Sequence, residues 1–129
     1  MKKNYIDYDQ KHWSKIKNPE EALKKYLNNY KDVYNRINID KILGIIPNNK
    51  KLKILDYGGG IGFLAAELKK LGHDVTLADQ SKEAINTAEF FFKKEKLDIK
   101  ILKAEKGYFS WEEKFDIIVA KDLIEHVIE

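Results

Sequence analysis

The sequence contains no cysteine, and only one of its basic residues, Arg36, is an arginine. The absence of cysteine excludes disulfide bonds, thiolate metal sites and cysteine nucleophiles. The other basic residues are lysines spread along the chain, and the net charge is only +3. Because surfaces that bind nucleic acid usually cluster lysine and arginine, we expect no nucleic-acid partner.

Long hydrophobic runs are also missing, since no apolar stretch approaches 18 residues. The segment that follows Met1 has no signal-peptide pattern. We therefore expect a cytoplasmic protein without membrane contact. Hydrophobic residues make up 43% and charged residues 35% of the 129 residues, which is typical of one soluble domain with a core.

The most informative stretch is residues 53–63, which read KILDYGGGIGF. An apolar run ends in Asp56, a glycine turn follows, and a helical pattern begins at once, which predicts a buried strand, a tight turn and a helix. A dinucleotide fingerprint has glycine at its first, third and sixth positions, but here the sixth position is Phe63. A P-loop is excluded because no Gly-Lys-Ser or Gly-Lys-Thr follows. The spacing that fits is acid-x-Gly-x-Gly-x-Gly.

Strand and helix patterns alternate through the rest of the chain. Strands are predicted at 52–57, 74–78, 98–103 and 115–120, with helices at 61–71 and 81–96 between them. This alternation predicts an α/β fold with right-handed crossovers and a mostly parallel sheet. The expected division is residues 1–50, an N-terminal arm and helices, and residues 51–129, a nucleotide-binding half-domain.

The N-terminal part is predicted to contain two helices. Asn18 and Pro19 form a helix start, and apolar residues at helical spacing then continue to Ile37. We expect its tyrosine stripe to pack in the core, and a second short helix at 40–46. Residues 1–17 are polar with aromatic residues between, which indicates either a loosely packed arm or a lid over a bound ligand.

An acidic residue follows the second strand. Asp79 lies about 20 residues past the glycines, where a carboxylate can accept hydrogen bonds from both hydroxyls of an adenosine ribose. The structural alternative is a helix cap, but Ser81 already suits that role. The helix that follows the glycine turn directs its N-terminus at the turn, which favours an anionic group there.

Asp56, Gly58, Gly60 and Gly62 together resemble motif I of the Rossmann-like S-adenosylmethionine (SAM)-dependent methyltransferases. Two further segments agree with that family: Asp79 after the second strand, and FDIIV leading to DLIEHV at residues 115–127. The DLIEHV run is similar to the small-molecule O-methyltransferases of ubiquinone biosynthesis. The resemblance implies the strand order 3-2-1-4 and SAM as the cofactor.

The family pattern also assigns roles by position. Gly58, Gly59, Gly60 and Gly62 would flank the methionine part of SAM, and Asp56 would hold its amino end. Asp79 would bind the ribose, and Gln80 would lie against the adenine. Glu105 is either a partner of the adenine amino group or a surface residue. The residues expected near the sulfonium or the acceptor are Lys121, Asp122 and His126.

His126 is a candidate base for an acceptor hydroxyl, with a solvent-facing side chain as the alternative. The Asn-Pro-Pro-aromatic motif of enzymes that methylate amino groups of bases or glutamine is absent. No metal is expected.

The family fold has seven strands, whereas this sequence covers the first four, so the fourth strand would present an open edge. Three explanations stand: a fragment of a longer enzyme, a chain that pairs its edge with a second copy or a partner chain, or a short SAM-binding protein without catalysis.

The function expected is SAM-dependent methyl transfer to a small-molecule acceptor, with this chain as the cofactor-binding portion. The runner-up is a Rossmann-type module for NAD or another adenosine ligand, against which Phe63 argues. A third alternative is an interaction subunit that keeps the fold and needs a partner chain.

Overall fold

A four-stranded parallel sheet forms the centre of the protein. The computed structural model describes residues 15–105 and 112–121. Its strands are β1 (Lys53–Tyr57), β2 (Asp74–Asp79), β3 (Lys100–Lys103) and β4 (Ile117–Val119). They lie in the order β3-β2-β1-β4 with every pair parallel, which confirms the predicted fold class and strand order.

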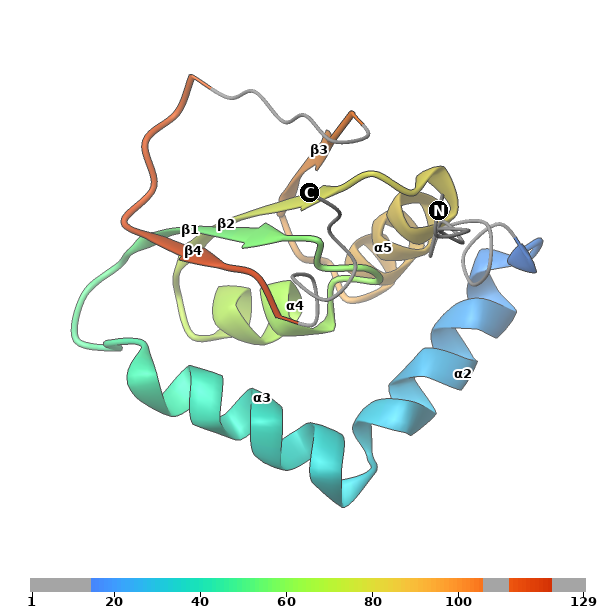
Figure 1. Ribbon diagram of the computed structural model, residues 1–129, viewed down its shortest axis with the longest axis horizontal. Coiled ribbons are helices and arrows are strands. Elements are labelled where there is room, and N and C mark those ends of the chain that lie inside the picture. Colours follow the sequence, from blue (N-terminus) through green and yellow to red (C-terminus); the bar gives the residue numbers. More distant parts are fainter. Residues whose placement is uncertain (1–14, 106–111, 122–129) are drawn as a thin grey trace, which may run out of the picture.

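Helices accompany the sheet in the part of the chain that the structure describes (Figure 1). They are α2 (Pro19–Tyr30), α3 (Val33–Ile45), α4 (Phe63–Lys70) and α5 (Lys82–Lys94). Helix α4 connects β1 to β2 and α5 connects β2 to β3, as the alternating pattern predicted. Both crossover helices pack against the strands, and α2 packs against α5.

The N-terminal helices differ from the prediction. Helix α2 ends at Tyr30, and α3 begins at Val33 and continues to Ile45. The predicted continuous helix to Ile37 and the separate helix at 40–46 are therefore both wrong. Asp32 caps α3 by accepting a hydrogen bond from the Tyr34 N–H at 2.9 Å. This local cap overrides the apolar spacing that runs across the break, because an N-cap stabilises a new helix start by about 1 kcal/mol.

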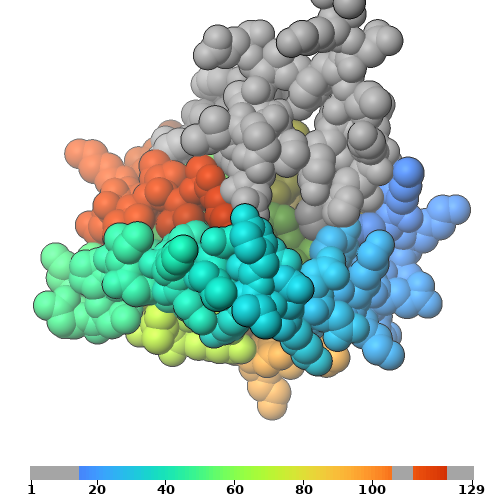
Figure 2. All heavy atoms as spheres, turned by 60° about the horizontal axis from the view of Figure 1, so that its bottom comes forward, coloured from blue at the N-terminus to red at the C-terminus, as the bar shows by residue number. Residues whose placement is uncertain are grey.

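One consequence is that part of the predicted apolar face points away from the core. Val33 and Tyr34 are 71% and 74% exposed, and Ile37 is 47% exposed. Figure 2 shows α3 crossing the front of the molecule, with α2 beside it. The expected core packing of the tyrosine stripe therefore holds for Tyr26 and Tyr30, which pack against the core, and is wrong for Tyr34.

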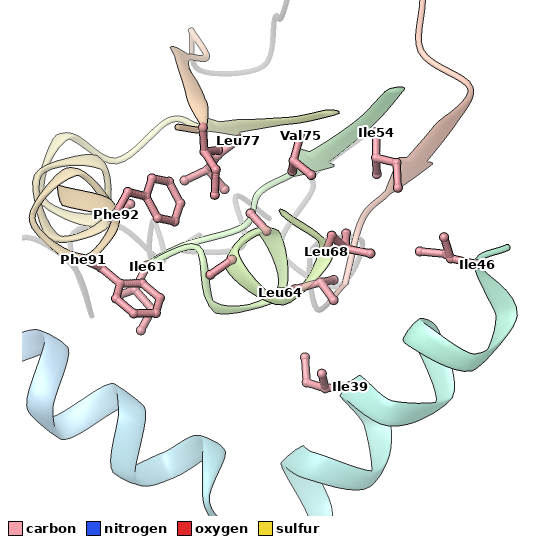
Figure 3. Packing of buried hydrophobic residues seen from close by; sticks show 14 of the residues in the cluster. Ile39, Ile46, Ile54, Ile61, Leu64, Leu68, Val75, Leu77, Phe91 and Phe92 are labelled. Carbon is pink, nitrogen blue, oxygen red and sulfur yellow. The ribbon is translucent and has the colours of Figure 1, made fainter. Parts of the chain in front are cut away.

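The core lies between the sheet and the helices (Figure 3). Ile54, Val75 and Leu77 of the strands meet Leu64 and Leu68 of α4 and the two aromatic rings of Phe91 and Phe92 on α5. Ile39 of α3 and Ile46, the residue that follows α3, extend the same cluster. Burial of side chains of this size stabilises the fold by roughly 1.5–3 kcal/mol each, which fixes the strand ends that carry the site.

An ionic cluster at the amino ends of the strands positions the segment before β4. Glu113 pairs with Lys53, at 3.2 Å, and with Lys100. These hydrogen bonds from the two lysines lower the pKa of Glu113. The Lys53 N–H also donates to Asp116 Oδ2 at 2.7 Å. Together these contacts set the register of β4 against β1.

Strand β4 lies at the edge of the described sheet. Within residues 15–105 and 112–121 it pairs only with β1, and Ile118 is 52% exposed. Among the same residues, no helix combines the length and hydrophobicity that crossing a bilayer requires. The cytoplasmic location stays a prediction.

Candidate functional site

The glycine turn begins where β1 ends and closes at the start of α4. Gly58, Gly60 and Gly62 have positive φ values of 72°, 59° and 83°. Because L-residues with side chains rarely adopt such values, this backbone path needs glycine at alternate positions. The spacing that singled out the motif in the sequence is therefore a spacing of left-handed residues.

Gly59 fulfils a different requirement, which is close packing. A Cβ atom at this position would lie 2.6 Å from Asp56 Oδ2 and would also collide with the Leu77 side chain. A methyl group at Gly62 would meet the Phe92 ring. The turn is thus held directly against β1, β2 and α5, and its backbone N–H groups have a fixed place at the carboxyl ends of the strands.

Asp79, the last residue of β2, connects the glycine turn to α5. Its Oδ2 atom accepts a hydrogen bond from the Gly60 N–H and its Oδ1 atom accepts one from the Ser81 N–H, each at 2.9 Å. Ser81 caps α5 by accepting from the Ala84 N–H at 3.3 Å, as predicted. A carboxylate can accept about four hydrogen bonds, so two backbone donors remain compatible with ribose hydroxyls.

Asp56, near the end of β1, is a buried carboxyl group that lacks full hydrogen bonding. It is 2% exposed, and its Oδ2 atom is the one buried side-chain polar atom without a partner in the described part of the chain. Burial, and then the nearby negative charge of Asp79, raise the pKa of Asp56 to about 7. A backbone hydrogen bond from Ala65 and the charge of Lys121 oppose that increase in pKa.

The start of α4 faces the same turn. Gly62 is its N-cap residue and supplies no side-chain cap, so the first-turn N–H groups rely on other acceptors. Phe63 stacks on Tyr30 of α2, with ring centroids 4.2 Å apart and planes inclined by 8°. Sequence reasoning placed Tyr30 only in the core and missed this contact, for which no local pattern gives a signal.

The remaining predicted residues that the structure describes follow the carboxyl ends of β2, β3 and β4. Gln80 and Glu105 are exposed, and Lys121 is half-buried just after β4. The Ala104 N–H donates to the Asp79 carbonyl oxygen at 2.8 Å, which brings the end of β3 beside the end of β2. Asp122 and His126, the candidate catalytic residues, lie outside the described residues.

His73 is a buried residue that the sequence analysis did not single out. Its Nδ1 atom accepts a hydrogen bond from the Leu52 N–H at 3.2 Å, so Nε2 carries the ring hydrogen and donates to Asn48 Oδ1, also at 3.2 Å. The ring therefore connects the loops that precede β1 and β2, which is a structural role. No group of three potential metal ligands occurs in the described ranges, 15–105 and 112–121.

Known proteins share the sequence and the fold that carry this glycine turn. Residues 24–121 match the family described as "Methyltransferase small domain". A ubiquinone biosynthesis O-methyltransferase of Pelagibacter ubique is 38% identical over 78 residues, which cover 60% of this chain and 32% of the relative. The enzyme of that description from Rickettsia prowazekii is 35% identical over 97 residues, which cover 72% of this chain and 38% of the relative. The chain thus spans about a third of the length of these relatives.

Solved structures share the fold. TehB from Haemophilus influenzae superimposes with a TM-score of 0.59 at 27% identity, covering 72% of this chain and 32% of that one. The magnesium protoporphyrin IX methyltransferase of Synechocystis, described with bound SAM, gives 0.59 at 19% identity over 70% of this chain and 46% of that one. The match to three quarters of the sequence, the strand order and the glycine turn agree: the chain belongs to the methyltransferase small domain family, within the Rossmann-like SAM-dependent methyltransferases.

Proposed function

We propose that this chain is the cofactor-binding portion of a SAM-dependent methyltransferase that acts on a small-molecule acceptor. The observation that carries the proposal is the pair of carboxyl groups, Asp56 and Asp79, placed on either side of a left-handed glycine turn. In open parallel sheets, ligands bind outside the carboxyl ends of the strands, which is where this turn lies.

The residues of the turn fit the chemical groups of SAM. Asp56 is a buried carboxyl group packed against Gly59 of the turn, where its negative charge can attract an ammonium group, and the first turn of α4 offers N–H groups for a carboxylate. Asp79 is oriented by two backbone donors and is a suitable acceptor for ribose hydroxyls. When bound, SAM supplies a methyl group activated by a sulfonium. The contribution of the chain is to fix the donor end so that an acceptor atom can approach in line.

The acceptor class follows from the relatives, whose names describe O-methyltransferases of ubiquinone biosynthesis. An acceptor hydroxyl needs a base, and His126, four residues after Asp122 in the sequence, keeps the role predicted for it. Gln80 and Glu105 are exposed near the end of β2 and β3, which is compatible with contacts to the adenine. Lys121 remains the candidate beside the sulfonium or acceptor.

The runner-up, an NAD-binding module, is disfavoured by one contact. The sixth position of a dinucleotide fingerprint requires glycine for close packing. Here that position is Phe63, whose ring is stacked on Tyr30. A non-catalytic SAM-binding subunit would have the same turn and would differ from the proposed enzyme portion only in lacking methyl transfer.

We also propose that the edge of β4, which is open within residues 15–105 and 112–121, pairs with a strand of a second copy or of a partner chain. An edge strand with an exposed Ile118 is a template for pairing. Sedimentation of the chain at increasing concentration tests pairing with a second copy, and a monomer at every concentration would leave only the partner chain.

Calorimetric titration with S-adenosylhomocysteine tests the proposed cofactor. We expect binding by the wild type, and binding weakened about 10-fold or more by Asp79→Asn, because hydrogen bonds to a charged group contribute about 1.5–3 kcal/mol. Asp74→Asn is the matched control, since Asp74 begins β2 at the opposite end and is exposed. Equal affinities for the two variants, or preferred binding of NAD, would contradict the assignment.

A further inference from the structure

Two buried carboxyl groups lie next to the glycine turn, and their negative charges would repel each other if both were ionised. Asp56 is 2% and Asp79 is 7% exposed. Two carboxylates that share a desolvated site resist simultaneous ionisation, so one of them tends to retain a proton. The hydrogen-bond pattern decides which one does.

Asp79 is the carboxyl group better suited to carry the charge. Each of its oxygens accepts a backbone N–H hydrogen bond, from Gly60 and Ser81, and such donors favour the ionised form. Asp56 Oδ2 accepts no hydrogen bond from the described residues. The proton therefore belongs on Asp56 in the ligand-free protein, and the pKa of about 7 for this carboxyl agrees with that assignment.

The groups that face Asp56 come from three elements. Asp79 lies on β2, Lys121 follows β4, and α4 contributes only the backbone of Ala65 among the described residues. Lys121 is half-buried and its opposing effect on the Asp56 pKa is the smallest of the causes. Among the described residues, the negative charge of Asp79 therefore affects the Asp56 pKa more than the positive charge of Lys121 does.

We propose that Asp56 couples cofactor binding to proton release: its carboxyl group loses a proton to the solvent when the ammonium group of the cofactor arrives beside it. The inference rests on the proposed function. Asp56 then distinguishes ligands by charge, because an adenosine ligand without the amino-acid part brings no ammonium group and leaves the Asp56 O–H bond intact. Affinity for the cofactor falls in acid, since the proton must be removed before the ammonium group is paired.

Calorimetry measures this proton directly. Binding heats are recorded at pH 6.5 in two buffers of different ionisation enthalpy, because the released proton is taken up by the buffer. At this pH an α-amino group is protonated, and a carboxyl of pKa about 7 holds about 0.8 proton. We expect S-adenosylhomocysteine to release close to that amount, and 5′-methylthioadenosine, which lacks the amino-acid part, to release almost none.

Two variants test whether the released proton comes from Asp56. Asp56→Asn should abolish the release, whereas Asp74→Asn, which alters an exposed carboxyl at the start of the neighbouring strand β2, should leave it unchanged. If the Asp56→Asn protein does not fold, the wild type alone provides the test. Its affinity for S-adenosylhomocysteine should increase up to about tenfold per pH unit below pH 7 and level off above it. The affinity for 5′-methylthioadenosine should stay flat.

The outcomes separate this inference from the proposed function. S-adenosylhomocysteine binding without proton release, or with a release that persists in Asp56→Asn, overturns the inference and leaves the cofactor assignment intact. Equal release by both ligands also overturns it, because the ammonium group would then be irrelevant. Failure of both ligands to bind would overturn the proposed function, and the inference with it.

Discussion

Replacing Asp56 by asparagine should remove a pH-dependent cost from the stability of the free protein. Burial and the Asp79 charge raise the Asp56 pKa from its ordinary value of 3.8 to about 7. For an acid whose pKa is raised by folding, the folded state binds the proton more tightly than the unfolded state. Stability therefore falls as pH rises between about 4 and 7 and is constant above that range.

The magnitude follows from the displacement of the pKa. Each pKa unit corresponds to about 1.4 kcal/mol, so the rise to about 7 costs the folded protein about 4 kcal/mol above pH 7. About 1.5 kcal/mol of that cost is already present at pH 5. The advantage of Asp56→Asn over the wild type should therefore grow by about 3 kcal/mol between pH 5 and pH 8. The unpaired amide of asparagine has the same cost at both pH values and cancels in this difference.

Urea unfolding at pH 5 and pH 8 measures the effect. The wild type, Asp56→Asn and Asp74→Asn are compared, because Asp74 is an exposed carboxyl of β2 and controls for the loss of one negative charge. Asp74→Asn should follow the wild type at both pH values. Parallel pH dependence of the wild type and Asp56→Asn would refute the reasoning, since it would mean that Asp56 titrates alike in the folded and unfolded states.

Four further substitutions test how the turn and its supports are built. Gly59→Ala should lower the free energy of unfolding by about 1–3 kcal/mol because its methyl group has no room. Gly44→Ala, where nothing lies within 4 Å, should raise it by up to about 1 kcal/mol; urea unfolding that ranks the two alike would contradict the packing described. His73→Phe leaves the buried Leu52 N–H without an acceptor and should cost about 1–3 kcal/mol in the same assay. Ser81→Ala should cost about 1 kcal/mol through loss of the α5 cap, and a thermal midpoint unchanged from wild type would disprove that role.

The fold was largely predictable because its strongest signals are local. β1 and β2 are continuous apolar runs that end in Asp56 and Asp79, and their bounds match the prediction closely. β3 and β4 are shorter than predicted, at Lys100–Lys103 and Ile117–Val119. Apolar alternation continues beyond the residues that pair, so it overestimates the length of strands near the edge of a sheet.

The helix break at Asp32 was not predicted because apolar spacing and capping gave opposite signals. The spacing of Val33 and Ile37 continues the pattern of α2, whereas the Asp32 side chain offers the backbone an alternative partner. The Asn35 side chain donates to the Asn29 carbonyl oxygen at 3.0 Å and stabilises the same break. Such side-chain to backbone hydrogen bonds join residues close in the sequence. Whether they end a helix depends on which of its faces packs against the core.

For the candidate site, the sequence identified the positions but not their interactions. The glycine spacing predicted the turn, and Asp79 was placed at the end of β2. The bonds from Gly60 and Ser81 to Asp79, and the missing partner of Asp56 Oδ2, arise only when β1 and β2 lie side by side. The stacking of Phe63 on Tyr30 likewise joins residues far apart in the sequence.

The most direct test of the central claim is to observe the glycine turn while a ligand is added. In a nitrogen–proton NMR correlation spectrum of the chain, S-adenosylhomocysteine should shift the amide signals of Gly58, Gly59, Gly60 and Gly62. The signals of Gly44 and Gly72, which lie in open surroundings, serve as internal controls and should stay in place. An equal concentration of NAD should leave all of these signals unchanged. If S-adenosylhomocysteine leaves the turn glycines unshifted, or if NAD shifts them instead, the assignment of this turn to the cofactor is wrong.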